Sequence, residues 1–191
     1  TQMFNTEKYK NICEELLPYN AKLIAVTKTK PITDIETAIQ NGQMCFGENY
    51  VQELTEKASA MSKNIQWHFI GHLQSNKVKY IAPFVHLIHG VDSFKLLQEI
   101  NKQALKNNRV IRCLLQVHIA EEETKFGLDD NELDEILKQV QQDKLKNIKI
   151  VGLMGMATFT ENKNQIKKEF LHLKSIFDRL NTENFKLKTL S

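Results

Sequence analysis

The 191-residue chain has little of what marks specialised classes of protein. It contains only three cysteines, three prolines and seven glycines, and its formal net charge is +3. Cys13, Cys45 and Cys113 are far apart and odd in number, so we expect neither a disulfide framework nor a zinc cluster. Each is interpreted as a small buried hydrophobic residue. The near balance of charge gives no electrostatic case for a nucleic acid partner.

Long apolar runs and several familiar motifs are also missing. No apolar segment is long enough to span a membrane, and residues 1–20 lack the apolar centre of a signal peptide. The sequence therefore predicts a protein without membrane association in a reducing, cytoplasmic setting. Neither the Gly-x-Gly-x-x-Gly fingerprint, the phosphate-binding loop of nucleoside triphosphatases nor a Gly-x-Ser-x-Gly elbow occurs. These absences remove support for dinucleotide, nucleoside triphosphate and serine hydrolase functions.

Short apolar runs alternate regularly with amphipathic stretches along the whole chain. Predicted strands cover residues 22–26, 44–49, 65–71, 87–91, 111–119, 148–154 and 187–191. Predicted helices cover residues 6–17, 31–42, 50–61, 78–84, 94–106, 131–142 and 166–180. This alternation predicts a parallel sheet with helices outside it, as a (β/α)8 barrel of the TIM type. An open doubly wound sheet is the second possibility.

The length of the chain limits how much of a barrel it forms. A complete barrel typically needs about 250 residues. We therefore expect one barrel domain over residues 1–191 that is cut off in its seventh strand, with the C-terminal part missing.

Lys28 is the most informative single residue because it follows the apolar run 23–26 at the end of a predicted strand. Parallel α/β folds gather their chemistry at that end of the sheet. A lysine there is either a solvated loop residue or an amine that attacks a carbonyl group. Position alone favours the solvated residue, since most lysines are exposed. Pyridoxal phosphate is the common cofactor that needs such an amine.

Other predicted strand ends also carry polar side chains. They include Lys30, Glu48, Asn49, His68, His72, Gln74, Asp92, His118 and Lys125, with Met154 as a softer member. Simple structural explanations compete at each position: Asn49 suits a turn and Met154 suits a core. His68 and His72 lie four apart, but on a strand that spacing is unsuited to one metal ion.

Taken together, several long motifs resemble one family. They are Ala-Val-Thr-Lys-Thr-Lys-Pro at 25–31, Phe-Gly-Glu-Asn-Tyr-Val-Gln-Glu at 46–53, Trp-His-Phe-Ile-Gly-His-Leu-Gln-Ser-Asn-Lys at 67–77 and Gly-Leu-Met at 152–154. In this order they resemble the pyridoxal phosphate homeostasis proteins, over about residues 22–191. One departure is His118, where the family pattern has asparagine.

The resemblance implies a fold like the N-terminal barrel of alanine racemase, the type III fold of pyridoxal phosphate proteins. It implies that Lys28 binds pyridoxal 5'-phosphate as a Schiff base and that Asn49, His68, Met154 and Ser191 also contact the cofactor. It implies a monomer that serves intracellular homeostasis of the cofactor without established turnover, with cofactor-free pyridoxal phosphate-dependent enzymes as candidate recipients. The family's phosphate-binding region is expected beyond Ser191. The alternatives are an amino-acid racemase or decarboxylase and a cofactor-free interaction protein.

Overall fold

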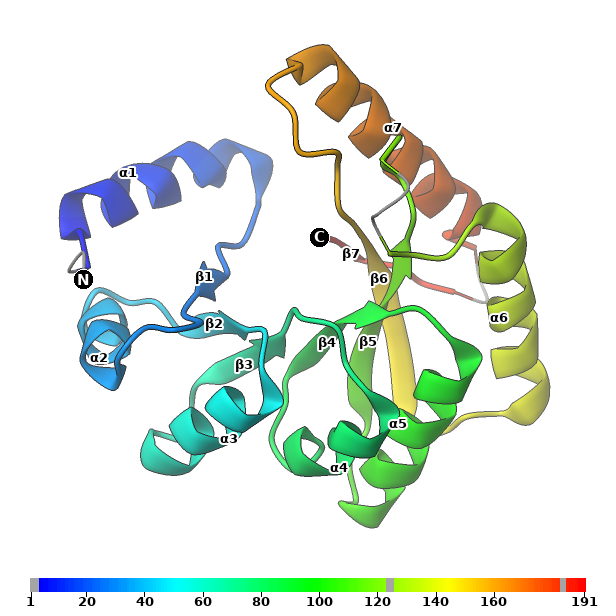
Figure 1. Cartoon of the computed structure of the whole chain (residues 1–191), viewed down its shortest axis with the longest axis horizontal. Coiled ribbons are helices and arrows are strands. Elements are labelled where there is room, and N and C mark those ends of the chain that lie inside the picture. Colours follow the sequence, from blue (N-terminus) through cyan, green and yellow to red (C-terminus); the bar gives the residue numbers. More distant parts are fainter. Residues whose placement is uncertain (1–3, 123–125, 183–184) are drawn as a thin grey trace.

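The computed structural model describes residues 4–122, 126–182 and 185–191. Seven strands form a single sheet in the order of the chain, and every neighbouring pair is parallel. The sheet curls into a half-barrel with α2 to α7 outside it, and it stays open between β1 and β7 (Figure 1). This is the predicted barrel architecture, interrupted at the seventh strand as expected.

The boundaries of the elements follow the apolar pattern closely. The strands are β1 (Ala25–Val26), β2 (Cys45–Glu48), β3 (Gln66–Phe69), β4 (Leu87–Val91), β5 (Ile111–Val117), β6 (Ile148–Gly155) and β7 (Thr189–Leu190). The α-helices are α1 (Thr6–Leu16), α2 (Ile32–Gln40), α3 (Val51–Ala60), α4 (Val78–Ile81), α5 (Phe94–Lys106), α6 (Asp130–Asp143) and α7 (Lys163–Leu180). Short 3-10 turns, η1 (Leu17–Tyr19) and η2 (Ser75–Lys77), lie beside α1 and α4.

The helix α5 shows how local sequence sets these boundaries. It begins directly after Ser93, whose hydroxyl accepts a hydrogen bond from the Leu96 N–H at 3.2 Å. This side chain satisfies one of the amide groups that the first turn of a helix leaves without a partner.

The first strand is the main correction to the predicted fold. Residues 22–26 were expected to form a buried strand, but only Ala25 and Val26 pair with β2, and Val26 is 50% exposed. The reason is topological: β1 is an edge strand, so it has a neighbour on one side only. The sequence pattern therefore predicts that the apolar residues of β1 are buried, but in the fold they are only partly covered.

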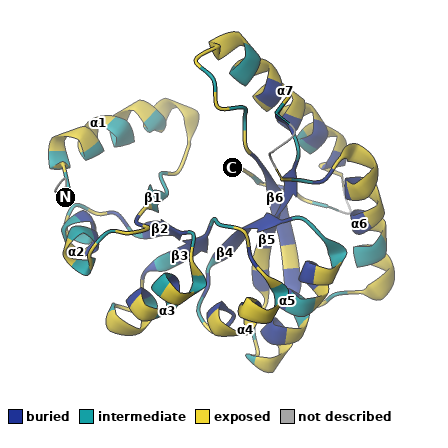
Figure 2. Cartoon of the chain, in the orientation of Figure 1, coloured by how far each residue is buried: buried dark blue, intermediate teal, exposed yellow. Residues whose placement is uncertain are grey.

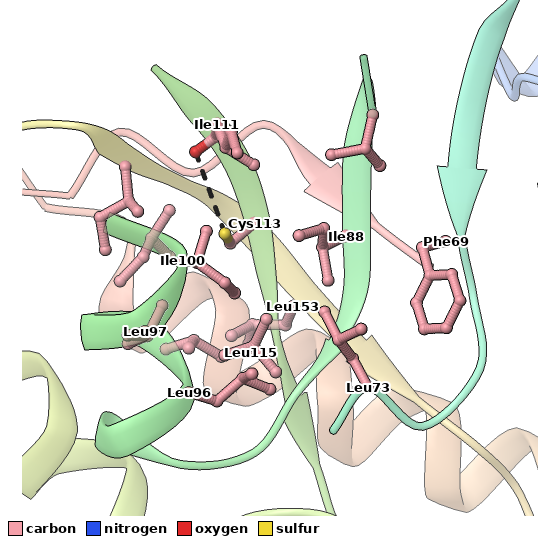
Figure 3. Packing of buried hydrophobic residues seen from close by; sticks show 14 of the residues in the cluster. Phe69, Leu73, Ile88, Leu96, Leu97, Ile100, Ile111, Cys113, Leu115 and Leu153 are labelled. Atoms are coloured by element: carbon pink, nitrogen blue, oxygen red, sulfur yellow. Dashed lines mark hydrogen bonds between the residues drawn. The ribbon is translucent and has the colours of Figure 1, made fainter. Parts of the chain in front are cut away.

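The main core lies between the sheet and its helices. Figure 2 shows the buried residues concentrated along the strands and on the helix faces that meet them. In Figure 3, side chains of β5 and β6 lie beside Leu96, Leu97 and Ile100 of α5, and Ile88 of β4 and Phe69 of β3 extend the same cluster away from this helix. Trp67 is 3% exposed and belongs to this core.

The cysteines only partly match their interpretation. Cys45 and Cys113 are buried, but Cys13 is partly exposed because α1 covers little of the molecule's core and has no buried residue. Burial raises the pKa of the Cys113 thiol to about 12, which makes it an unreactive packing residue. Its Sγ lies 3.9 Å from the Ile111 carbonyl oxygen (Figure 3).

The concave face of the sheet has a second, smaller cluster. Leu87, Leu114, Val151 and Met154 pack together there. Because successive side chains of a strand point to opposite faces, Leu114 lies on this face while Leu115 lies in the main core. Within the described ranges, no helix is both long and apolar enough to cross a membrane.

Candidate lysine site at the strand ends

Lys28 occupies a tight turn that follows β1. The turn runs from Thr27 to Lys30 and is closed by a 3.0 Å hydrogen bond from the Lys30 N–H to the Thr27 carbonyl oxygen. Thr29 has a φ of +61°, a left-handed conformation that is rare for a β-branched residue. The side chain of Lys28 is exposed. The turn therefore presents the amine to solvent on a strongly constrained backbone.

A buried polar cluster lies behind this turn, between β2 and α3. The Lys57 Nζ donates to Glu48 Oε1 at 2.7 Å and to Glu53 Oε1 at 2.7 Å. The Thr27 hydroxyl also donates to Glu48 Oε1, at 2.6 Å. Glu48 is fully buried. A carboxylate this deep needs such charged and hydrogen-bonded partners.

A chain of hydrogen bonds crosses the concave face from β3 to the end of β7. His68 Nδ1 lies 2.9 Å from His89 Nε2, and His89 Nδ1 lies 2.9 Å from the Ser191 Oγ. Each link holds one proton, whose donor depends on the tautomers of the two rings. The other ring nitrogen of His68, Nε2, is buried without a hydrogen-bond partner. His68 is thus a hydrogen-bonded histidine, as the sequence favoured over a metal ligand.

His68 and His89, the two histidines joined by these hydrogen bonds, favour the neutral form. Burial, followed by the neighbouring His89, lowers the pKa of His68 to about 3. Burial lowers the pKa of His89 to about 4. At neutral pH these two histidines therefore offer ring nitrogens as donors or acceptors rather than positive charge.

Asn49 directly follows β2, so it lies at the rim of the sheet formed by the carboxyl ends of the strands, where Lys28 follows β1. Its Oδ1 is buried and has no hydrogen-bond partner. The backbone of Gly71 presses against that of Asn49, since a Cβ on Gly71 would lie 2.8 Å from the Asn49 Cα. A groove of about 900 Å³ opens beside Asn49, and Phe69 and Tyr80 are among its lining residues. The structure therefore leaves the Asn49 Oδ1 as a buried acceptor without a donor.

The remaining predicted site residues have different positions. Met154 is 7% exposed and packs in the concave apolar cluster, and Ser191 is joined to His89. Lys30 closes the turn through its backbone. Lys125 lies outside the described residues. Among the described residues, no group of three or more histidine, cysteine or acidic side chains could hold a metal ion.

Comparison with known proteins places this chain in a family. The alanine racemase N-terminal domain model matches residues 5–191. A protein of Aquifex aeolicus named pyridoxal phosphate homeostasis protein is 39% identical over 164 residues, which cover 85% of this chain and 71% of that protein. This chain belongs to the pyridoxal phosphate homeostasis protein family. The human member is 37% identical over 153 residues, 75% of this chain and 55% of that protein.

Solved structures of the family agree with the half-barrel. PipY of Synechococcus elongatus without pyridoxal phosphate has a TM-score of 0.89 and 30% identity, over 97% of this chain and 86% of that one. The same protein with the cofactor bound has a TM-score of 0.87 and 29% identity, over 97% and 87%. An alanine racemase of Streptomyces lavendulae shares only the fold, with a TM-score of 0.74 and 14% identity over 89% and 46%.

Two features of the site were missed by sequence reasoning. His89 was read only as part of an apolar strand, although a histidine among four less polar residues of β4 is itself a signal. Lys57 was read as part of an amphipathic helix, yet it is 5% exposed. Its spacing of four residues from Glu53 could have indicated a pair. Nothing in the sequence indicated that this pair would lie beneath the turn of Lys28.

Proposed function

We propose that this chain binds pyridoxal 5'-phosphate and serves the intracellular homeostasis of the cofactor, with Lys28 as the residue that forms the covalent bond. The observation that carries the proposal is the exposed amine of Lys28 on a constrained turn at the carboxyl end of β1. The names of the relatives and the cofactor-bound PipY structure support it.

The chemistry needed from Lys28 is simple. Its neutral amine adds to the aldehyde carbon of the cofactor, the C=N bond of a Schiff base forms and water leaves. Hydrolysis by water reverses the same step and releases the cofactor, as a protein that stores or delivers it requires.

Two polar groups at the ends of other strands, after β2 and β7, would suit the cofactor. The unpartnered Asn49 Oδ1 can accept a hydrogen bond, and the Ser191 hydroxyl can donate one to an oxygen anion. If the hydroxyl donates outward, its oxygen accepts from His89 Nδ1–H, and His89 Nε2 then accepts from His68. The buried histidine chain can thus adjust its protons to a bound anion without becoming charged. Met154 would add an apolar contact.

Borohydride trapping tests the assignment of Lys28. Reduction of the cofactor-loaded protein should convert the C=N bond to a stable amine, and peptide mapping should place the adduct on Lys28. Lys28→Ala should give no adduct at this site, whereas the matched Lys30→Ala should retain it. An adduct that maps to another lysine contradicts the assignment. Turnover of an amino acid faster than with free cofactor would instead favour a racemase or decarboxylase.

A further inference from the structure

The turn that carries Lys28 is held from behind on both of its flanks. On one flank, the Lys57 Nζ donates to the Thr27 carbonyl oxygen at 2.6 Å. On the other, the Thr29 N–H donates to Glu53 Oε1 at 2.6 Å. Because Lys57 and Glu53 are also bonded to each other, α3 grips the backbone immediately before and after Lys28 with one linked unit.

We propose that Glu53 and Lys57 are positioning residues that hold the Lys28 amine ready for its aldehyde. This inference rests on the proposed function, because it assigns a role relative to the Lys28 bond. Neither residue reaches the aldehyde in this role: they act through the backbone of Thr27 and Thr29.

The conformation of Thr29 explains why a grip is needed. A threonine at a φ of +61° is strained, and such a conformation persists only where its surroundings hold it. The edge position of β1 gives little help, since the strand has two paired residues and one neighbouring strand. The side chains of α3 therefore supply the constraint that a longer, central strand would provide through its ladder.

A second ion pair on the protein shows that this arrangement is not a general helix feature. Lys174 and Asp178 on α7 have the same spacing of four residues and an N–O distance of 2.6 Å. Their side chains are 52% and 59% exposed, and within the described residues both hydrogen bonds of Lys174 go to Asp178. Lys57 and Glu53 are 6% and 24% exposed and both bond to the Lys28 turn.

Glu53→Met is the decisive variant because it removes the acceptor for Thr29 while Glu48 and Lys57 still neutralise each other. We expect the apparent affinity for pyridoxal phosphate, read from the visible absorbance of the bound cofactor, to fall about tenfold, the usual effect of losing one charge-assisted hydrogen bond. Amide hydrogen exchange of the cofactor-free protein should become faster at residues 27–30. The variant also loses the bond from Lys57 Nζ to Glu53, but Lys57 keeps Glu48 and the bond from Thr29 is at an exposed turn, so the thermal midpoint should fall only modestly.

Two further variants control the experiment. Glu53→Gln keeps an oxygen that can accept from Thr29, so most of the affinity and of the slow exchange should return. Lys174→Met removes the comparable exposed pair and should match the wild type in all three measurements. Lys57→Met should weaken binding further, but it leaves Glu48 buried without its cation and lowers stability as well.

The outcomes separate this inference from the proposed function. Unchanged exchange at residues 27–30 in Glu53→Met overturns the positioning role, whatever the cofactor does. Unchanged affinity in Glu53→Met, with faster exchange, also overturns it, since the grip would then not matter to binding. If the wild type forms no adduct on Lys28, the proposed function fails, and so does any role of the grip in presenting Lys28 to pyridoxal phosphate.

Discussion

The two faces of the curled sheet differ sharply in chemistry. The face toward the helices is almost entirely apolar, and Phe46, Phe69 and Leu115 on this face are fully buried. The concave face combines a four-residue apolar cluster with His68 and His89. Among the described residues, the few polar groups buried in the helix-facing layer have partners, as Glu48 has in Lys57. One face therefore stabilises the fold, while the other face and the rim hold groups that stability does not explain.

This difference follows from what each face must contact. Helices cover one face, so a polar side chain there loses water and needs a partner within the protein. Figure 1 shows no helical layer on the concave face, and His68 and His89 on this face are joined in a chain of hydrogen bonds that ends at Ser191. Unpartnered atoms such as Asn49 Oδ1 and His68 Nε2 are costly for a core but useful to a binding site.

The largest expected effect compares two neighbouring leucines, both 0% exposed, on opposite faces of β5. Leu115→Ala should lower the free energy of unfolding by about 3–5 kcal/mol, because it leaves a cavity in the main core. Leu114→Ala should cost about 2–3 kcal/mol, since its cluster is small and the surroundings can adjust. Urea unfolding measures both values. Equal costs would contradict the view that the helix-facing layer carries most of the stability.

An intermediate effect is expected from the concave histidines as pH falls. Their pKa values in the fold, about 3 and about 4, lie below the ordinary 6.5, so below pH 6.5 the unfolded chain binds protons that the folded chain does not. Stability is therefore fully present above pH 6.5 and is lost as pH falls toward 4 and 3. By pH 5 one such histidine costs roughly 2 kcal/mol.

The variant His89→Gln tests this sign and size. It removes one titrating ring, so the drop in unfolding free energy between pH 7 and pH 5 should shrink by about 2 kcal/mol. The test compares how steeply the unfolding free energy of the variant and of the wild type changes with pH, and the absolute stability of the variant does not enter it. A slope equal to that of the wild type would show that the concave face does not keep His89 neutral.

Sequence reasoning predicted the helix-facing half of this comparison better than the concave half. Apolar periodicity placed all seven strands and seven helices, because burial against helices imposes a repeating pattern on each element. It overestimated β1, since periodicity does not show which strand lies at an edge. The hydrogen bonds from His68 through His89 to Ser191 join residues up to 123 positions apart. Only the strand order and curvature of the folded sheet bring these residues together.

The smallest expected effect concerns Glu169 on α7, a buried acid in the helical layer that should otherwise be dry. Burial acts to raise its pKa, but hydrogen bonds from Thr158, Glu121 and Gln165 outweigh it and hold the pKa at about 2. Because the folded value lies below the ordinary 4.5, its contribution to stability is present above pH 4.5 and is lost as pH falls toward 2.

Glu169→Gln should therefore cost about 1 kcal/mol at neutral pH, by weakening charge-assisted bonds to the loops after β5 and β6. It should also flatten the pH dependence below 4.5 while leaving the histidine-dependent change between pH 7 and pH 5 unchanged. Urea unfolding at pH 7, 5 and 3.5 separates the two windows. A change confined to pH 5–7 would mean that Glu169 acts through the concave histidines, and the two faces would then be electrostatically coupled rather than independent.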